Sequence, residues 1–219
     1  MRVIAVSLVM VVMGLYALCA IGVLALRWID PPTTMVQMER RLEALRRHHA
    51  YKKRYDFVPL ARIAPVLQHA VISAEDGRFR QHHGFDWVEM QKVLEDDIKR
   101  GRLGRGGSTI TQQLVKNLFL TTERSLIRKG AEFAVVPMVE ALLSKDRILE
   151  LYLNVIEWGP GIYGAQAASE YFYHVPASGV SREQAARLAS IVPSPLKRKP
   201  ERMNEYSEEI LNRMARVGW

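Results

Sequence analysis

The chain contains a single cysteine, Cys19, and fewer acidic than basic residues. One cysteine excludes an internal disulfide, so cysteine usage says little about the redox state of the compartment. The 31 lysines and arginines outnumber the 23 aspartates and glutamates, which leaves a net charge of +8. This excess indicates an anionic partner, such as nucleic acid, phospholipid or a phosphorylated substrate. Charge alone does not choose among these partners.

The sequence also lacks repeats, low-complexity tracts and convincing runs in which apolar and polar residues alternate. These absences argue against a repeat architecture and against a sheet-rich fold. Of the 219 residues, 48% are hydrophobic and 25% are charged, which is a globular composition with room for one substantial domain. We therefore expect a mostly α fold, with the domain over residues 59–219.

An apolar run over residues 3–26 is interrupted only by Ser7, Gly14 and Gly22. As a helix it would be about 36 Å long at ~1.5 Å per residue, enough to cross a bilayer. A cleaved signal peptide would have a shorter apolar region and a small-residue cleavage site. A lipoprotein signal would need a small residue in place of Leu18. We predict an uncleaved transmembrane anchor over residues 1–28, and the flanking arginines leave its orientation open.

Helical spacing of apolar residues continues after the anchor. Residues 29–58 are expected to form a juxtamembrane basic helical segment, which we interpret as a solvated connector in preference to a specific phospholipid contact. Its predicted helix carries Met35, Met38, Leu42 and Leu45 on one face and has Thr33 or Thr34 as its cap. In the domain we expect helices over 63–74, 87–99, from Ser108 onward, 123–143, 145–154, 163–172, from Ser181 to Ile191, and 201–216. The expected caps are Asp86 for 87–99, Thr122 for 123–143, Ser144 for 145–154, and a capping box of Ser181 and Gln184 for the helix that ends at Ile191. Pro137 is expected to kink the helix over 123–143.

Residues 106–117 join a glycine pair to a row of hydroxyls and amides that ends in Lys116 and Asn117. Core helices need apolar stripes and solvated helices usually carry charge, so this mixture predicts a polar ligand. The spacing of Gly101 and Gly106 resembles a phosphate-binding loop. However, Gly107 occupies the position of the required lysine, and the nucleotide interpretation is rejected.

Glu75 and Asp76 end an apolar segment. Burying a charge among apolar residues costs free energy, so charged residues at this place suggest a functional role. Phe79 lies four residues after Glu75, so a shared helical face would put its ring beside the carboxylate and raise the pKa of that carboxylate toward a useful base. The alternative is a solvated Glu75 with Phe79 in the core. His82 and His83 have no third ligand at a recognised zinc spacing.

Arg124, Arg128 and Glu132 recur at intervals of four residues, which places them on one helical face. Two guanidiniums beside one carboxylate can bind a pyrophosphate. An ordinary surface salt bridge explains the same spacing equally well.

Together these blocks resemble the glycosyltransferase domain of bacterial peptidoglycan polymerases (glycosyltransferase family 51), and the match is close to the monofunctional biosynthetic transglycosylases. It covers about residues 59–195. The family's blocks correspond to Glu75, Asp76, Phe79, His82 and Gly84; to the unchanged Gly-Gly-Ser-Thr-Ile-Thr-Gln-Gln at 106–113; to Arg128, Lys129 and Glu132; to Lys145, Glu150, Tyr152 and Asn154; and to Gly161, Tyr163, Gly164 and Tyr171. Ala131, Gln166 and Pro137 depart from the family pattern.

The resemblance implies a single lysozyme-like glycosyltransferase domain that polymerises lipid II into β-1,4 glycan with inversion and release of polyprenyl pyrophosphate. It implies an inner-membrane protein with a cytoplasmic N-terminus and a periplasmic domain. Its expected partners are lipid II, the nascent glycan strand, the membrane and other cell wall synthesis or division proteins, without nucleic acid. A divalent cation, Mg²⁺ or Mn²⁺, is expected to assist with no assigned ligands, and no organic cofactor is expected. The expected catalytic residues are Glu75 and Glu132, and the expected substrate-binding residues are Asp76, Phe79, His82, Ser108, Thr109, Thr111, Gln112, Gln113, Lys116, Asn117, Arg124, Arg128, Lys129, Tyr152 and Asn154.

Two other functions fit parts of the sequence. A lysozyme-like or lytic enzyme that cleaves glycan could also use a glutamate in an α domain, and it would shorten finished glycan. A non-enzymatic, membrane-tethered module could bind anions through its arginines, and it would tolerate the loss of Glu75.

Overall fold

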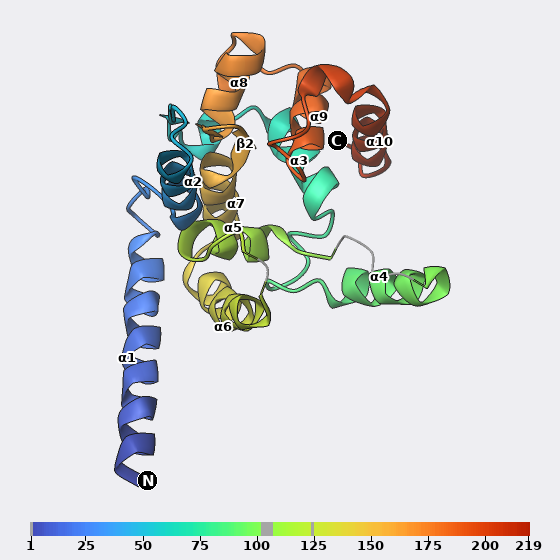
Figure 1. The fold of residues 1–219 in the computed structure, drawn as a ribbon. Helices are drawn as coiled ribbons and strands as arrows, with labels where there is room; N and C mark the ends of the chain where they lie inside the picture. Colours follow the sequence, from blue (N-terminus) through green and yellow to red (C-terminus); the bar gives the residue numbers. More distant parts are fainter. Residues whose placement is uncertain (1, 102–106, 124) are drawn as a thin grey trace.

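The computed structural model describes residues 2–101, 107–123 and 125–219. These residues form a mostly helical molecule, as the sequence predicts (Figure 1). Its elements are α1 (Arg2–Ala25), α2 (Met35–Arg46), β1 (Arg54–Tyr55), η1 (Leu60–Arg62), α3 (Pro65–Glu75), α4 (Trp87–Arg100), α5 (Ile110–Phe119), α6 (Leu126–Leu142), α7 (Lys145–Val155), β2 (Glu157–Gly159), β3 (Ile162–Tyr163), α8 (Ala165–Tyr173), η2 (Ala177–Gly179), α9 (Arg182–Ile191), η3 (Pro200–Arg202) and α10 (Asn204–Arg216).

Helix α1 confirms that the N-terminal apolar run is helical, and its first half projects away from the rest of the molecule (Figure 1). Near its C-terminal end Val23 and Leu26 are buried against the domain. The Tyr16 hydroxyl donates to the backbone oxygen of Ala134 in α6 at 3.4 Å. Within the described part of the chain, no helix is both long and apolar enough to cross a membrane. The anchor predicted over residues 1–28 is therefore not confirmed.

The core lies where α3, α5, α7 and α9 pack together, with α10 against α3 and α9 and with α6 against α5. Helix α7 shows why these helices meet. Ile148, Leu151 and Leu153 point to different sides of the helix, and all three are fully buried. An α-helix that is apolar around most of its circumference needs neighbours on several sides.

Capping residues decide where the helices begin. Ser144 caps α7, and Ser181 and Gln184 form the predicted capping box of α9. Helix α6 begins later than expected and is capped by Ser125, not Thr122. The reason is that both the backbone N–H and the hydroxyl of Thr122 donate to Glu39 of α2, at 2.8 and 3.0 Å.

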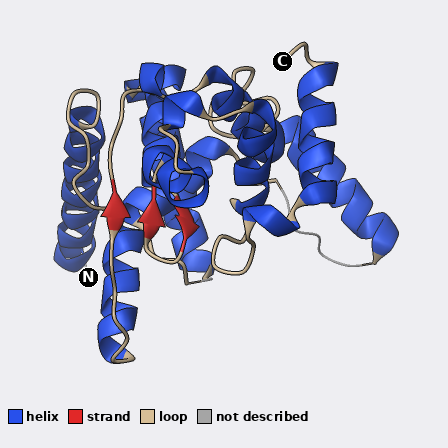
Figure 2. Ribbon diagram, turned by 90° about the horizontal axis from the view of Figure 1, so that it is seen from above, coloured by secondary structure: helices blue, strands red, loops and turns tan. Residues whose placement is uncertain are grey.

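Pro137 lies inside α6, as the sequence predicts. One further detail differs from the sequence-based expectations. A small sheet, in the order β1-β3-β2, was not predicted (Figure 2). Strand β1 pairs in parallel with β3, and β2 is antiparallel to β3. Its strands are two or three residues long, too short to show an alternating pattern.

Helix α2 is capped by Thr34 and turns Val36 and Gln37 toward the domain. The predicted apolar face does not pack on the domain, because Met38, Leu42 and Leu45 are exposed. Ion pairing helps to fix this orientation, since Arg40 Nε lies 3.1 Å from Glu157 Oε2 in β2.

Candidate active site

A cleft of about 790 Å³ opens between two walls that come from distant parts of the chain. The end of α3 and the helices α4, α5 and α6 form one wall. The segment after α9 and the helix α10 form the other. The first wall contributes Glu75, Asp76, Gln113, Lys116, Arg128, Lys129 and Glu132 to the lining, and the second contributes Val192, Pro193, Tyr206 and Arg213.

Glu75 is the last residue of α3 and faces the cleft. Its Oε2 accepts a hydrogen bond from Gln113 Nε2 at 2.7 Å. Its Oε1 is buried and has no hydrogen-bond partner among the described residues. Burial raises the pKa of this carboxyl, the Gln113 hydrogen bond and the charges of Lys116 and Arg198 oppose that rise, and the neighbouring Asp76 adds to it. A half-buried carboxylate with one unpaired oxygen is suited to accept a proton.

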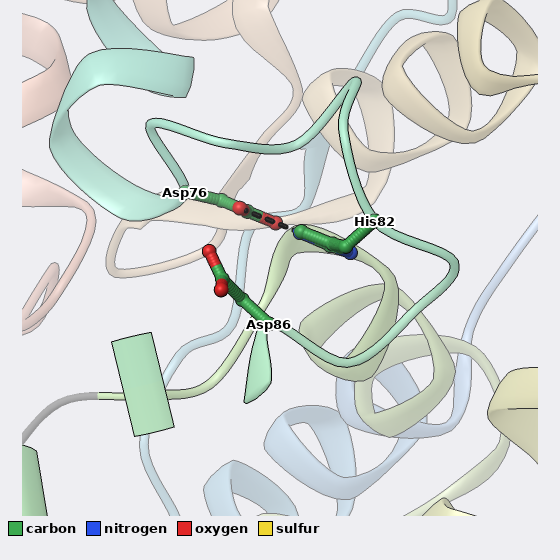
Figure 3. A group of neighbouring side chains, drawn as sticks. All are labelled: Asp76, His82 and Asp86. Carbon is green, nitrogen blue, oxygen red and sulfur yellow. Dashed lines mark hydrogen bonds and ion pairs between the residues drawn. The ribbon is translucent and has the colours of Figure 1, made fainter. Parts of the chain in front are cut away.

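Asp76 holds helix α5 in place and does not offer a free carboxylate to a ligand. Its Oδ2 accepts from the backbone N–H of Ile110, the first residue of α5, at 3.0 Å, and its Oδ1 lies 2.8 Å from His82 Nε2 (Figure 3). Asp76 and His82 are both buried. They therefore fix the start of the helix that carries Gln113 and Lys116, a positioning role that differs from the expected substrate contact.

Asp86 completes a group of three potential metal ligands with Asp76 and His82, whose ligand atoms lie within 4.8 Å of one another (Figure 3). However, Asp86 Oδ1 already caps α4 by accepting from the Glu89 N–H at 3.0 Å, and its Oδ2 lies 3.7 Å from the Arg78 guanidinium. Both oxygens of Asp76 are engaged as well. The two carboxylates and His82 Nε2 serve the protein's own contacts and do not fit a Mg²⁺ site, so we assign no metal there.

Cationic side chains gather on the α5 and α6 side of the cleft. Glu132 is buried, with Arg128 Nη1 at 3.0 Å from Oε2 and with Lys129 Nζ bound to Oε1. Lys116 lines the same part of the cleft, and burial lowers the pKa of its ammonium while the charge of Glu132 opposes this effect. The structure thus brings together three of the predicted cations with the second glutamate. The fourth, Arg124, lies outside the described residues.

Helix α5 begins with a capping box formed by Thr109 and Gln112. Thr109, not Ser108, is the cap, and the Gln112 side chain turns back to accept from the Thr109 N–H at 3.0 Å. The Thr109 hydroxyl donates to the Gly84 carbonyl at 2.6 Å. Gly84 has φ +89°, and a Cβ there would clash with Val136, which accounts for the glycine. Gln113 is the residue of this helix that reaches Glu75, while Ser108 and Gln112 also line the cleft.

Phe79, predicted to bind substrate, is fully buried and does not line the cleft. Helix α3 ends at Glu75, so the helical spacing assumed for these two residues does not exist. Instead, the Lys145 ammonium lies 4.5 Å from the centre of the Phe79 ring. The same lysine binds Glu140 Oε1 at 2.8 Å. The ring therefore packs in the core and holds the loop after α3 in place.

Five other predicted substrate-binding residues are also absent from the cleft lining, namely His82, Thr111, Asn117, Tyr152 and Asn154. The Thr111 hydroxyl donates to Glu140, and Asn117 Nδ2 donates to the backbone oxygen of Gln113 at 2.8 Å. Asn154 bonds both backbone polar groups of Val58 at 2.9 Å, which ties α7 to the segment before η1. Tyr152 is fully buried and reaches the site only through Gln113. Gln166, a departure from the family pattern, bonds Ala177 and Glu170 away from the cleft.

The second wall of the cleft was missed by the sequence analysis. Tyr206 and Arg213 of α10 line it, and Arg198 stacks over the Tyr206 ring at 4.8 Å while donating to the Ser190 carbonyl at 2.7 Å. No local pattern could have found them, because they meet Glu75 only through the packing of α9 and α10 on α3.

Comparison with known proteins places the chain in one family. The family model described as Transglycosylase matches residues 41–217. A biosynthetic peptidoglycan transglycosylase of Thiobacillus denitrificans is 51% identical over 173 residues, which cover 77% of this chain and 73% of the relative. A protein of the same name from Laribacter hongkongensis is 45% identical over 169 residues, covering 77% and 74%. Another from Pseudomonas entomophila is 43% identical over 197 residues, covering 90% and 80%.

Proposed function

The chain belongs to the transglycosylase family and is a peptidoglycan glycosyltransferase that polymerises glycan strands for cell wall synthesis, and on this premise we propose that Glu75 is its general base. The main support for this proposal is the environment of the Glu75 carboxyl. One of its oxygens is held by Gln113 and the other has no hydrogen-bond partner among the described residues at the wall of the main cleft.

The proposed substrate is lipid II, a disaccharide-peptide on a polyprenyl pyrophosphate. Glu75 takes the proton of the acceptor sugar's 4-hydroxyl while that oxygen attacks the anomeric carbon of the growing glycan. The carbon–oxygen bond to the pyrophosphate breaks, and the polyprenyl pyrophosphate leaves with the electron pair. Attack from the face opposite the leaving group converts an α-linked donor into a β-1,4 linkage. A positioned base of this kind typically contributes ~10²–10⁴-fold in rate.

Cations, and not a second carboxylic acid, are proposed to assist departure of the pyrophosphate. A pyrophosphate is already a stable anion, unlike the leaving group of a glycoside hydrolase, which must be protonated. Lys116, Arg128 and Lys129 line the cleft on the side of Glu132. Both oxygens of Glu132 are engaged by Arg128 and Lys129, which supports a role in orienting these cations.

The lytic alternative is tested by measuring whether the protein lengthens or shortens glycan strands. Purified protein is incubated with lipid II and, separately, with finished glycan strands. We expect glycan to lengthen and polyprenyl pyrophosphate to appear in the first incubation, with no shortening in the second. Shortening of finished strands without growth from lipid II would favour a lytic enzyme. Repeating the first incubation with a chelator, and then with Mg²⁺ or Mn²⁺ restored, tests the proposed assistance by a divalent cation.

We further propose that α1 holds the domain on the outer face of the cytoplasmic membrane. Its apolar side chains support this placement, since Val9, Val12 and Leu15 are more than half exposed. A polyprenyl substrate stays in the bilayer, so the cleft must lie near its surface. Protease added to spheroplasts should digest the domain, whereas intact cells should protect it. Protection in both preparations would contradict this orientation.

A further inference from the structure

We propose that Tyr152 is a positioning residue for the general base, because it fixes the orientation of the Gln113 amide and thereby keeps Glu75 ready to accept a proton. This inference rests on the proposed role of Glu75. Tyr152 itself does not line the cleft. Its effect on the reaction passes through one intermediate side chain.

The three side chains form a continuous hydrogen-bonded chain from the core to the cleft. The Tyr152 hydroxyl donates to Gln113 Oε1 at 3.0 Å, and Gln113 Nε2 donates to Glu75 Oε2 at 2.7 Å. They come from different helices: Tyr152 from α7, Gln113 from α5 and Glu75 from α3. The packing of the three helices therefore assembles this hydrogen-bonded chain of Tyr152, Gln113 and Glu75, hereafter the relay, and no single helix contains it.

The orientation of the amide decides which form of Glu75 is favoured. With Nε2 toward the carboxyl, the amide donates, which favours the ionised base. If the amide turned over, its oxygen would face Oε2, and only a protonated carboxyl could donate to it. The Tyr152 hydroxyl donates a hydrogen bond to the amide oxygen when that oxygen faces the core. It therefore stabilises the orientation of the amide that favours the ionised form of Glu75.

Tyr152 is well suited to donate at every working pH. The side chain is fully buried, and burial holds the pKa of its phenol well above the usual value. The hydroxyl thus stays protonated. Its ring is held in α7, which is buried along most of its length, so the side chain cannot easily move to form a hydrogen bond with another partner.

Other charged groups act on Glu75 and are left unchanged when only the Tyr152 hydroxyl is removed. These are Lys116 of α5 and Arg198 after α9, which favour ionisation, and Asp76, which opposes it. Loss of the hydroxyl should therefore move the titration of Glu75 in one direction only. The amide can then turn over when Glu75 is protonated, which stabilises the protonated form and raises the pKa of the base.

The test is the pH profile of lipid II polymerisation by Tyr152→Phe. The acid limb of kcat should move upward by about 0.5–1 pH unit, as expected for the loss of one orienting hydrogen bond. The rate at high pH should approach that of the wild type, and KM should change little. Tyr163→Phe is the matched control, because Tyr163 is equally buried and its hydroxyl lies beside Tyr51 and Glu157, away from the relay. It should leave the acid limb in place.

A second variant keeps the test decisive if Tyr152→Phe folds poorly. Gln113→Met removes the relay while keeping a side chain of similar length, and its acid limb should move at least as far. Adding Tyr152→Phe to Gln113→Met should cause no further shift. An acid limb at the wild-type pH in Tyr152→Phe, together with a lowered Tm, would make Tyr152 a purely structural residue. A further shift in the double variant would show that Tyr152 acts by another route.

Glu75→Gln separates this inference from the proposed function. If Glu75→Gln polymerises lipid II at the wild-type rate, the role of Glu75 as base fails and the relay fails with it. If Glu75→Gln is inactive while Tyr152→Phe keeps the wild-type pH profile, only the relay fails.

Discussion

Replacing Asp76 should destabilise the protein strongly, because this buried carboxylate joins the loop after α3 to the start of α5. Asp76→Ala removes the acceptor of the Ile110 N–H and the partner of His82, at 3.0 and 2.8 Å. A hydrogen bond to a charged group contributes about 1.5–3 kcal/mol, and a buried group left without a partner costs about 1–3 kcal/mol. We therefore expect a loss of about 3–5 kcal/mol in the free energy of unfolding.

For a domain of this size, a loss of that magnitude corresponds to a fall in Tm of about 6–20 °C. Thermal and urea denaturation, followed by circular dichroism, measure it. Asp76→Asn keeps one acceptor oxygen and should lose less. Asp146→Ala is the matched control, since this exposed carboxylate pairs with Arg80 at 2.8 Å and such a pair contributes about 0–1 kcal/mol. If Asp76→Ala were no less stable than Asp146→Ala, the anchoring role of Asp76 would be wrong.

Three further predictions concern the charged groups of the cleft. Lys116→Met should lower kcat/KM for lipid II at least about tenfold through loss of a pyrophosphate cation, whereas Lys92→Met on exposed α4 should not; equal kinetics would refute the role of Lys116. Glu132→Gln should lose about 3 kcal/mol of stability in denaturation, because it leaves Arg128 and Lys129 beside an uncharged buried partner, whereas Glu209→Gln should lose almost none. Glu75→Gln should raise Tm above pH 5 and not below pH 4. The pKa of Glu75 is higher in the folded protein than its value of 4.5 in the unfolded chain, so ionisation of Glu75 destabilises the folded wild type once the pH exceeds 4.5. A difference in Tm that stays constant across pH would contradict this.

Local patterns predicted the helices of the domain well. Apolar spacing and the caps Asp86, Ser144 and Ser181 placed α4, α7 and α9 to within a residue or two. The start of α6 was wrong because Thr122 is held by Glu39, a partner 83 residues away that no local pattern indicates. The short sheet was missed for a related reason, since its strands are stabilised only by their pairing.

The sequence identified the site better than the roles of its residues. The motifs located Glu75, Lys116, Arg128 and Glu132, which the structure gathers in one cleft. They could not separate residues that face the cleft from residues that hold it together. Phe79 belongs to the second kind, because its orientation follows from the end of α3. The wall formed by α10 had no motif at all.

The central claim is that the Glu75 carboxylate performs the proton transfer in the main cleft. Polymerisation of lipid II by purified wild-type protein and by Glu75→Gln, both shown to be folded by circular dichroism, tests it most directly. We predict a fall in kcat of about 10²–10⁴-fold for the variant. Glycan synthesis by a folded Glu75→Gln at the wild-type rate would contradict the claim.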